Sequence, residues 1–158
     1  MNARMPELKH CFETAGFSEV RTVLSSGNVA FDARAASLDA LARRAQDAMT
    51  RELARSFGTF VRSASHLQAL LASDPFAGFT LPARAKLVVT FLRRAPDPAV
   101  ALPIERDDAS ILAVRAAEAF ACYLPGEKGP VFMRLLERTF GSDITTRTID
   151  TVRKCAVA

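Results

Sequence analysis

The chain has 158 residues, of which 49% are hydrophobic, and a formal net charge of +4. A chain of this length buries one sizeable core, so we expect a single compact unit over residues 1–158, made of half-domains 1–80 and 81–158. No apolar run reaches the roughly 18 residues that a membrane-spanning helix needs, and the first residues lack the apolar core of a signal peptide. We therefore expect a cytoplasmic protein with no membrane partner.

The cysteines and histidines indicate neither disulfides nor a metal. Cys11, Cys122 and Cys155 lie far apart in apolar stretches, which suits small buried side chains in a reducing compartment. His10 and His66 have no Cys or His partner at ligand spacing and are interpreted as surface or boundary residues. We expect no metal site and no cofactor.

The first elements along the chain are a short helix and a β-hairpin. Apolar residues recur at helical spacing over 6–15, and Gly16 suits a left-handed helix stop. Apolar residues alternate over 19–25 and again over 28–32, on both sides of the turn-forming Ser25-Ser26-Gly27-Asn28. This pattern predicts a hairpin.

The strongest helical pattern covers residues 37–57, and Gly58 marks the expected end of that helix. Four charged residues take its outward face: Arg43, Arg44, Asp47 and Arg51. A short strand over 59–62 and a short helix that contains 67–71 are expected next.

The second half begins with Lys86–Leu92, a nearly continuous run rich in β-formers that predicts a central strand buried on both faces. Residues 95–108 contain three prolines and predict a connection. The alanines of 110–124 suit a helix, but its β-branched and aromatic residues suit two short strands, and we choose the strands. The segment 125–130 predicts a turn.

Two helices are expected near the end of the chain. The first runs to Phe140 and stops at Gly141, and the second contains Thr148–Ala156. The junction between them carries two hydroxyls and a guanidinium.

The two halves of the sequence echo each other. In the first half, Phe57-Gly58 precedes Arg62 and a hydroxyl-rich helix start. In the second half, Phe140-Gly141 precedes Arg147 and a second hydroxyl-rich helix start. The order suggests duplication of a split βαβ unit. Such a unit needs a strand before the helix at residue 6, and the sequence offers none, which leaves an open slot in the sheet. Either another segment fills this slot or the chain lacks its first strand, and we expect that the strand is missing.

Several short motifs follow one another along the chain: Met5-Pro6-Glu7-Leu8, Gly16-Phe17, Val20-Arg21-Thr22, Ser26-Gly27-Asn28-Val29, Asp74-Pro75-Phe76, Lys86-Leu87-Val88-Val89, Thr145-Thr146-Arg147 and Thr151-Val152. In this order they resemble, over nearly the whole chain, a bacterial family known only as domain of unknown function 1697. The resemblance implies an α+β fold of two ferredoxin-like halves with no established activity.

The resemblance also implies two departures from the family pattern. The family usually begins with an additional strand that ends in Arg-Gly-Ile-Asn and Gly-Gly, so a late start codon or a truncation is expected at Met1. It also typically has Asn and Trp after the arginine, where this chain has Arg147-Thr148-Ile149.

The segment Phe140–Arg147 supplies the main candidate site. The unpaired amides of a helix start favour negative charge, and Arg147 adds a bidentate donor, so Thr145, Thr146 and Arg147 are candidate anion ligands. The simpler interpretation makes the threonines helix caps and the arginine an ion-pair partner.

Two further residues are secondary candidates. Asn28 most simply serves the hairpin turn, and otherwise faces a groove shared with the missing loop. Arg62 is the repeat counterpart of Arg147 and faces the same groove or only marks the duplication.

These observations favour a non-catalytic binding module for a small anionic ligand or an acidic partner segment. One alternative is an enzyme, acting on phosphorylated small molecules, that a truncation has weakened. Another is low-specificity nucleic-acid binding, which is disfavoured because the 21 basic residues are spread along the chain with acids between them. No converging titratable pair and no Gly-rich phosphate loop marks a catalytic site.

Overall fold

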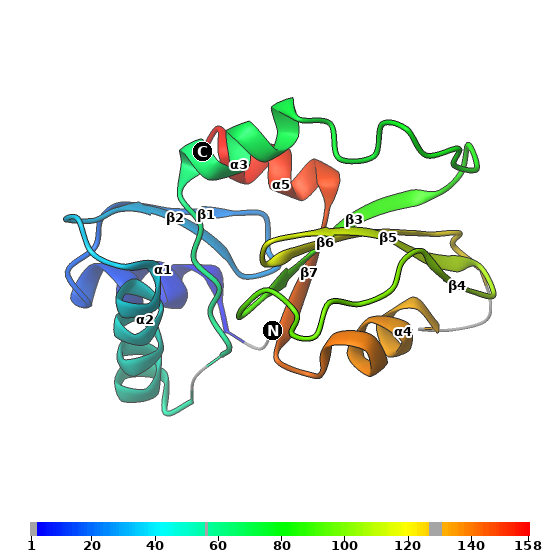
Figure 1. Ribbon diagram of the computed structural model, residues 1–158. Helices are drawn as coiled ribbons and strands as arrows, with labels where there is room; N and C mark the ends of the chain where they lie inside the picture. The colour runs from blue at the N-terminus through cyan, green and yellow to red at the C-terminus, as the bar shows by residue number, and fades with distance from the viewer. Residues whose placement is uncertain (1–2, 56, 127–130) are drawn as a thin grey trace. The chain divides into compact units, whose positions relative to one another are not determined.

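The computed structural model describes residues 3–55, 57–126 and 131–158. This part of the chain contains five helices and two sheets, and every strand pair is antiparallel (Figure 1). The expected α+β class is therefore confirmed. Within the described ranges, no helix combines the length and the hydropathy that crossing a bilayer requires.

The chain divides into two compact units. The first holds Met1–Ala69 together with Arg153–Ala158, and the second holds Leu70–Val152. The expected half-domains 1–80 and 81–158 stay a prediction.

The first unit contains helices α1 (Met5–Thr14) and α2 (Leu38–Leu53), which pack against each other. Ser37 begins α2, because its Oγ accepts a hydrogen bond of 3.1 Å from the backbone N–H of Ala40. Buried residues recur at helical spacing on both helices: Leu8, Cys11 and Phe12 on α1, and Leu41, Ala45, Ala48 and Met49 on α2.

A hairpin completes this core. Strands β1 (Ser18–Val23) and β2 (Asn28–Asp32) are antiparallel, as the sequence predicts. The Phe31 ring lies 4.3 Å from the Phe17 ring and 5.8 Å from the Phe12 ring, measured between centroids. Aromatic pairs at such distances stabilise a core beyond the area that they bury.

Helix α2 ends at Leu53, and the prediction that it runs to residue 57 is wrong. The next residue, Ala54, has a φ of 58°, so the chain leaves the helix through a left-handed residue that is not glycine. Gly58 therefore has no part in stopping this helix.

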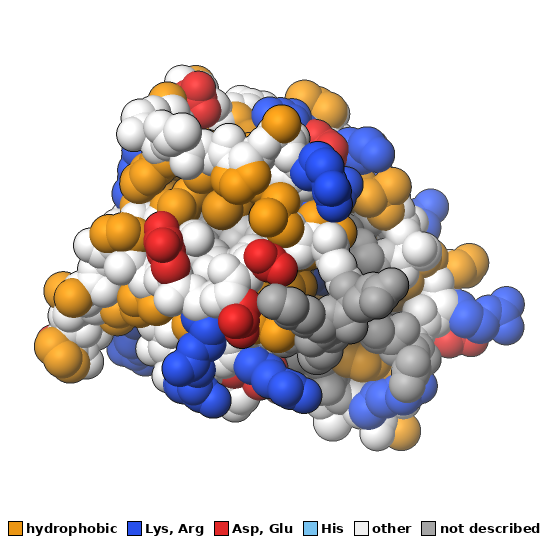
Figure 2. All heavy atoms as spheres, turned by 90° about the vertical axis from the view of Figure 1, so that its right-hand side faces the viewer, with side chains coloured by type: hydrophobic (Ala, Val, Ile, Leu, Met, Phe, Trp, Pro, Cys, Tyr) orange, Lys and Arg blue, Asp and Glu red, His pale blue; other side chains and the backbone are white. Residues whose placement is uncertain are grey.

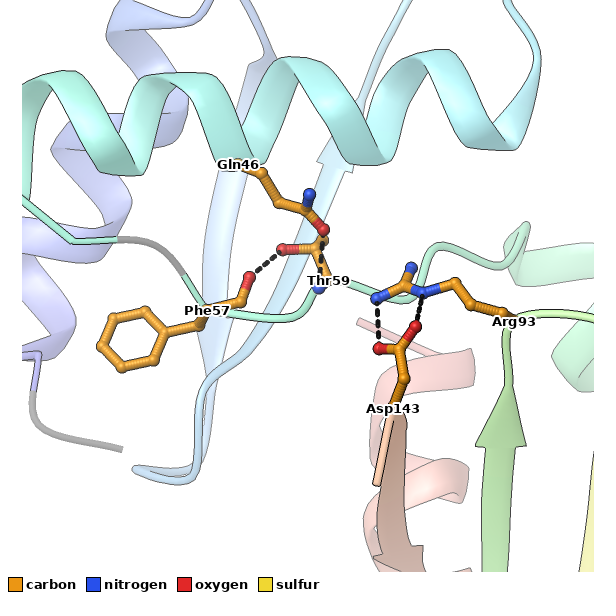
Figure 3. Close-up of polar contacts among 5 residues, drawn as sticks. All are labelled: Gln46, Phe57, Thr59, Arg93 and Asp143. Atoms are coloured by element: carbon orange, nitrogen blue, oxygen red, sulfur yellow. Dashed lines mark hydrogen bonds and ion pairs between the residues drawn. The ribbon is translucent and has the colours of Figure 1, made fainter. Parts of the chain in front are cut away.

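The expected strand over 59–62 is also wrong, because residues 57–63 lie outside every helix and strand. The backbone N–H of Thr59 donates instead to Oε1 of Gln46 on α2 at 3.1 Å, and the Thr59 hydroxyl donates to the Phe57 carbonyl at 3.0 Å (Figure 3). A side chain of α2 thus satisfies this amide. The expected short helix follows as α3 (Ala64–Ala72).

The sheet of the second unit has the strand order β4-β5-β6-β3-β7. Its strands are β3 (Lys86–Leu92), β4 (Ile104–Arg106), β5 (Ala109–Arg115), β6 (Glu118–Tyr123) and β7 (Ile144–Thr148). Strand β3 is an interior strand between β6 and β7 and is largely buried, and 110–124 forms two strands, as the sequence predicts.

The connection 95–108 holds one element that the sequence does not predict. Within it, Ile104–Arg106 pairs with β5 as the edge strand β4, with Ile104 opposite Ile111. Three residues are too few to show an alternating pattern.

Helix α4 (Val131–Phe140) covers one face of this sheet, where Leu135 and Leu136 share a core with Val88 and Ile111. It ends as predicted at Gly141, whose φ is 86° and whose N–H donates to the Glu137 carbonyl at 2.7 Å. Strands β6 and β7 each pair antiparallel with β3 between them, so β6, α4 and β7 form a split βαβ unit. The turn expected over 125–130 falls largely on residues 127–130, outside the described residues.

Helix α5 (Ile149–Ala156) follows β7 directly, and its residues from Arg153 onward belong to the first unit. There the Gln68 side-chain amide donates to the Ala156 carbonyl at 2.9 Å, and the Arg21 guanidinium donates to the Ala158 carbonyl at 2.8 Å.

Candidate functional site

The predicted helix start at Thr145–Arg147 is wrong, because these residues lie inside strand β7. The pairing of β7 with β3 runs from Ile144 opposite Leu92 to Thr148 opposite Val88. The β-branched residues at 144–146 favour a strand, and the neighbouring strand supplies the partners for their backbone groups. Neither Thr145 nor Thr146 caps a helix.

The alternation of a strand separates the three predicted ligands. Thr146 points to the face that α4 covers, where its hydroxyl lies 2.8 Å from that of Thr90. Thr145 and Arg147 point to the opposite face. There Nη1 of Arg147 donates to the Thr145 hydroxyl and to the Thr146 carbonyl, each at 2.9 Å. The guanidinium thus bonds to its own strand.

The true helix start lies at Ile149. Thr148 caps it, since its Oγ1 accepts a hydrogen bond of 3.3 Å from the backbone N–H of Thr151. One backbone N–H at the start of α5 is therefore already hydrogen-bonded to the Thr148 side chain.

Asn28 begins β2 and closes the hairpin turn. Its side-chain amide donates to the Val23 carbonyl at 3.1 Å and to the Ser26 hydroxyl at 2.8 Å. Gly27, the residue before it, has a φ of 86°. These contacts agree with the simpler interpretation of Asn28 as a turn residue.

Arg62 is half-buried in the segment 57–63, and its Nη1 donates to the carbonyl of Val61 at 2.9 Å. Arg62 and Asn28 belong to the first unit, whereas the β7 residues belong to the second. A role of either residue in ligand binding stays a prediction.

An open hollow of about 390 Å³ lies on the first unit, where the end of α1 meets α2. We call it the arginine hollow. Helix α2 contributes Arg43, Arg44, Asp47 and Arg51, and α1 contributes Thr14 and the residue after it, Ala15. Residues of α2 three, four and seven positions apart share one face of the helix, so the four charged side chains line the hollow together.

A left-handed glycine shapes the α1 end of the hollow. The N–H of Phe17 donates to the Phe12 carbonyl at 3.2 Å, and the N–H of Gly16 donates to the Glu13 carbonyl at 3.0 Å. This is the Schellman pattern, and the φ of 93° at Gly16 and the 5.5 Å contact between the two phenylalanine rings complete it. The stop that the sequence predicts at Gly16 is confirmed.

Arg44 is held in place beside this turn. Its Nε donates to the Ala15 carbonyl at 2.7 Å, and its guanidinium carbon lies 4.4 Å from the centroid of the Phe17 ring. The first contact satisfies a carbonyl at the end of α1, and the second is a cation–π contact. The Arg44 side chain makes no other hydrogen bond with a described residue, so its Nη groups remain available as donors.

The remaining charges of the hollow are exposed. The side chains of Arg43 and Asp47 make no hydrogen bond or ion pair with any residue in the described part of the chain. Nε of Arg51 lies 3.7 Å from a carboxylate oxygen of Glu52. An exposed pair of this kind contributes little energy and exchanges readily for a ligand.

The hollow thus combines three guanidinium groups with one carboxylate. Guanidinium groups bind phosphate and carboxylate in bidentate geometry, so the chemistry of the hollow is that of anion recognition. The sequence marks the same four residues as the outward face of a helix but contains no signal that α1 ends beside them.

Two of the three cysteine thiols are poor nucleophiles. Cys11 and Cys122 are buried, and burial raises the pKa of both thiols, with a smaller contribution from Glu52 and Glu105 respectively. A protonated thiol is a poor nucleophile and a poor metal ligand. No group of three or more His, Cys, Asp or Glu side chains that suits a metal ion occurs among residues 3–55, 57–126 and 131–158.

The family model described as "Protein of unknown function (DUF1697)" matches residues 1–120. This match gives no support to the expectation that a first strand is missing. The motif Thr145-Thr146-Arg147 lies beyond the matched range, so its part in the resemblance stays a prediction. No curated protein and no solved structure that was compared with the chain matches it.

Proposed function

Because the chain belongs to the family of proteins of unknown function called DUF1697, whose name assigns no activity, we propose from its own residues that it is a non-catalytic binding module for a small anionic ligand. The binding site of this proposal is the arginine hollow of the first unit rather than the β7 segment.

One observation carries the proposal, namely the charge balance of the hollow. Three arginines and one aspartate give its lining a net charge of +2 at neutral pH. A concave surface whose lining has a net charge concentrates ligands of the opposite sign. Arg44 adds preorganisation, because its contacts with Ala15 and Phe17 are in place before a ligand arrives.

The size of the hollow supports a small ligand. Its volume of about 390 Å³ lies at the lower end of the range of roughly 300–1,000 Å³ that small-molecule sites occupy. Its charged and exposed lining differs from that of most such sites, which are largely apolar. We therefore expect modest affinity that falls as salt is added.

The test is calorimetric titration of the folded protein at low ionic strength with inorganic phosphate, a dicarboxylate and adenosine triphosphate. The double variant Arg43→Ala/Arg51→Ala is expected to weaken the best ligand by about tenfold or more, the loss of one or two charge-assisted hydrogen bonds. Arg34→Ala is the matched control, since it removes one exposed charge of the same unit outside the hollow.

Two results contradict the proposal. If the double variant binds every ligand as tightly as the parent, the hollow is not the site. If Arg147→Ala abolishes binding and the double variant does not, the ligand binds at β7 instead.

The other expectations stay predictions. An acidic segment of a partner protein is compatible with the same hollow. No observation on the described residues specifically supports the enzyme alternative. Nucleic-acid binding is disfavoured because the basic residues are spread along the chain with acids between them. Figure 2 likewise shows acidic side chains beside several Lys and Arg side chains on the face drawn.

We further propose that the chain consists of two ferredoxin-like halves. The second unit supports this, because β6, α4 and β7 form a split βαβ unit in a sheet of order β7-β3-β6-β5. The connection from β3 to β5 holds strand β4 in place of the helix of a second such unit. The first unit has a helix, a hairpin and a helix in the order that such a half requires. An experimental structure in which β1, β2 and α2 do not superpose on β5, β6 and α4 would rule out the duplication.

A further inference from the structure

The charges in the arginine hollow follow a fixed order along α2. Arg43 and Arg44 stand at one end, Asp47 stands in the middle, and Arg51 stands at the other end. The rise of an α-helix places positions 44 and 51 about 10 Å apart along the axis, on the same face. The hollow therefore has two separate positive ends.

Asp47 lies between these ends, three residues after Arg44 and four before Arg51. An ionised carboxylate only accepts hydrogen bonds, and it repels an anion placed beside it. The carboxylate of Asp47 makes no hydrogen bond or ion pair with a described residue, so its oxygens are available to a ligand. The middle of the hollow thus suits a donor or a cation.

The two positive ends cannot easily move together around one small anion. Arg44 is fixed by its hydrogen bond of 2.7 Å to the Ala15 carbonyl and by the Phe17 ring. Arg51 lies two turns further along α2, beyond the Asp47 carboxylate. A single phosphate at Arg43 and Arg44 leaves Arg51 unused.

We propose that the ligand of the arginine hollow is an elongated molecule with two anionic groups about 10 Å apart and a hydrogen-bond donor between them. One anionic group binds Arg43 and Arg44, the other binds Arg51, and the donor binds Asp47. This inference rests on the proposed function and specifies its ligand class.

The experiment uses a homologous series of linear α,ω-alkanediol bisphosphates, together with one member whose spacer carries a central secondary ammonium. Inorganic phosphate and pyrophosphate serve as compact references. Affinity is expected to rise with spacer length, to peak where the phosphates are about 10 Å apart, and to exceed that of the references by about tenfold. The ammonium-bearing member is expected to bind most tightly.

Two exposed substitutions separate the ends of the hollow from its middle. Arg51→Ala is expected to weaken the best bisphosphate by about tenfold and to change phosphate affinity by less than about twofold. Asp47→Asn is expected to remove the advantage of the ammonium-bearing member while leaving or raising the affinity of the plain series. Arg34→Ala is again the control, and circular dichroism checks that each variant is folded.

The outcomes distinguish the inference from the proposed function. If phosphate or pyrophosphate binds as tightly as the best bisphosphate, and Arg43→Ala abolishes that binding, the hollow binds anions but the elongated ligand is wrong. If Arg51→Ala weakens phosphate and bisphosphate equally, the two-ended arrangement is also wrong. If no member of the series and no reference binds at low ionic strength, the proposed function itself is wrong.

Discussion

Arg44 of α2 and Ala15 at the end of α1 are joined by a hydrogen bond of 2.7 Å between Nε and the carbonyl oxygen. Gly16 follows Ala15, and a Cβ atom at Gly16 would stand 2.7 Å from Nη2 of Arg44. The same guanidinium therefore limits the residue at the helix stop and forms one end of the arginine hollow.

The substitution Gly16→Ala is expected to lower the free energy of unfolding by about 1–3 kcal/mol, because alanine is strained at a φ of 93° and its methyl group displaces Arg44. Urea unfolding measures this change. Gly141→Ala is the matched control, since Gly141 ends α4 at a φ of 86° with nothing within 4 Å of a Cβ. A loss no larger than the control's would mean that the Arg44 contact contributes nothing to stability.

The hydroxyls of Thr90 and Thr146 form a hydrogen bond of 2.8 Å between β3 and β7, and Thr90 is fully buried. Thr90→Val leaves the Thr146 hydroxyl without this partner and is expected to cost about 1 kcal/mol. The double variant Thr90→Val/Thr146→Val is expected to cost less than the sum of the single variants. Thermal unfolding of all four proteins gives the coupling energy, and additive losses would show that the bond is not stabilising.

The Arg93 guanidinium binds the Asp143 carboxylate through two hydrogen bonds of 3.0 and 3.2 Å (Figure 3). The two side chains are 35% and 64% exposed, so water screens the pair. A double-mutant cycle with Arg93→Ala and Asp143→Ala is expected to give a coupling energy below about 1 kcal/mol that falls in high salt. A larger or salt-independent coupling would contradict this assignment.

The two buried thiols make stability depend on alkaline pH. Burial raises the pKa of Cys11 and Cys122 in the folded state above the ordinary value of 9.0. Below that pH both states keep the protons, but above it the unfolded thiols ionise first, so the free energy of unfolding falls as pH rises. Urea unfolding at increasing pH measures the slope, and the variant Cys11→Ala/Cys122→Ala is expected to show a shallower one. Identical slopes would mean that other groups carry the dependence.

The spacing of apolar residues in the sequence is sufficient to predict the elements that bury a continuous stripe of apolar side chains. Helix α2 and strand β3 have clear apolar patterns, and both form where the sequence predicts them. The end of α2 was missed because Ala54 takes a left-handed conformation without the glycine that usually indicates one.

Strand β7 was missed for a different reason. The stretch Thr145–Arg147 has polar side chains on both faces of the strand, so no alternation of apolar residues indicates a strand. Its pairing with β3, more than fifty positions earlier, decides the structure. The arginine hollow depends equally on a distant contact, between Ala15 and Arg44.

The course of α5 has a consequence for how this protein is made. Because residues 153–158 return to the unit that residues 1–69 begin, cleaving the backbone at one place never releases that unit whole. During synthesis on the ribosome, Arg21 and Gln68 emerge long before the carbonyls of Ala158 and Ala156 that they bind. The part of the chain translated first is therefore the part completed last.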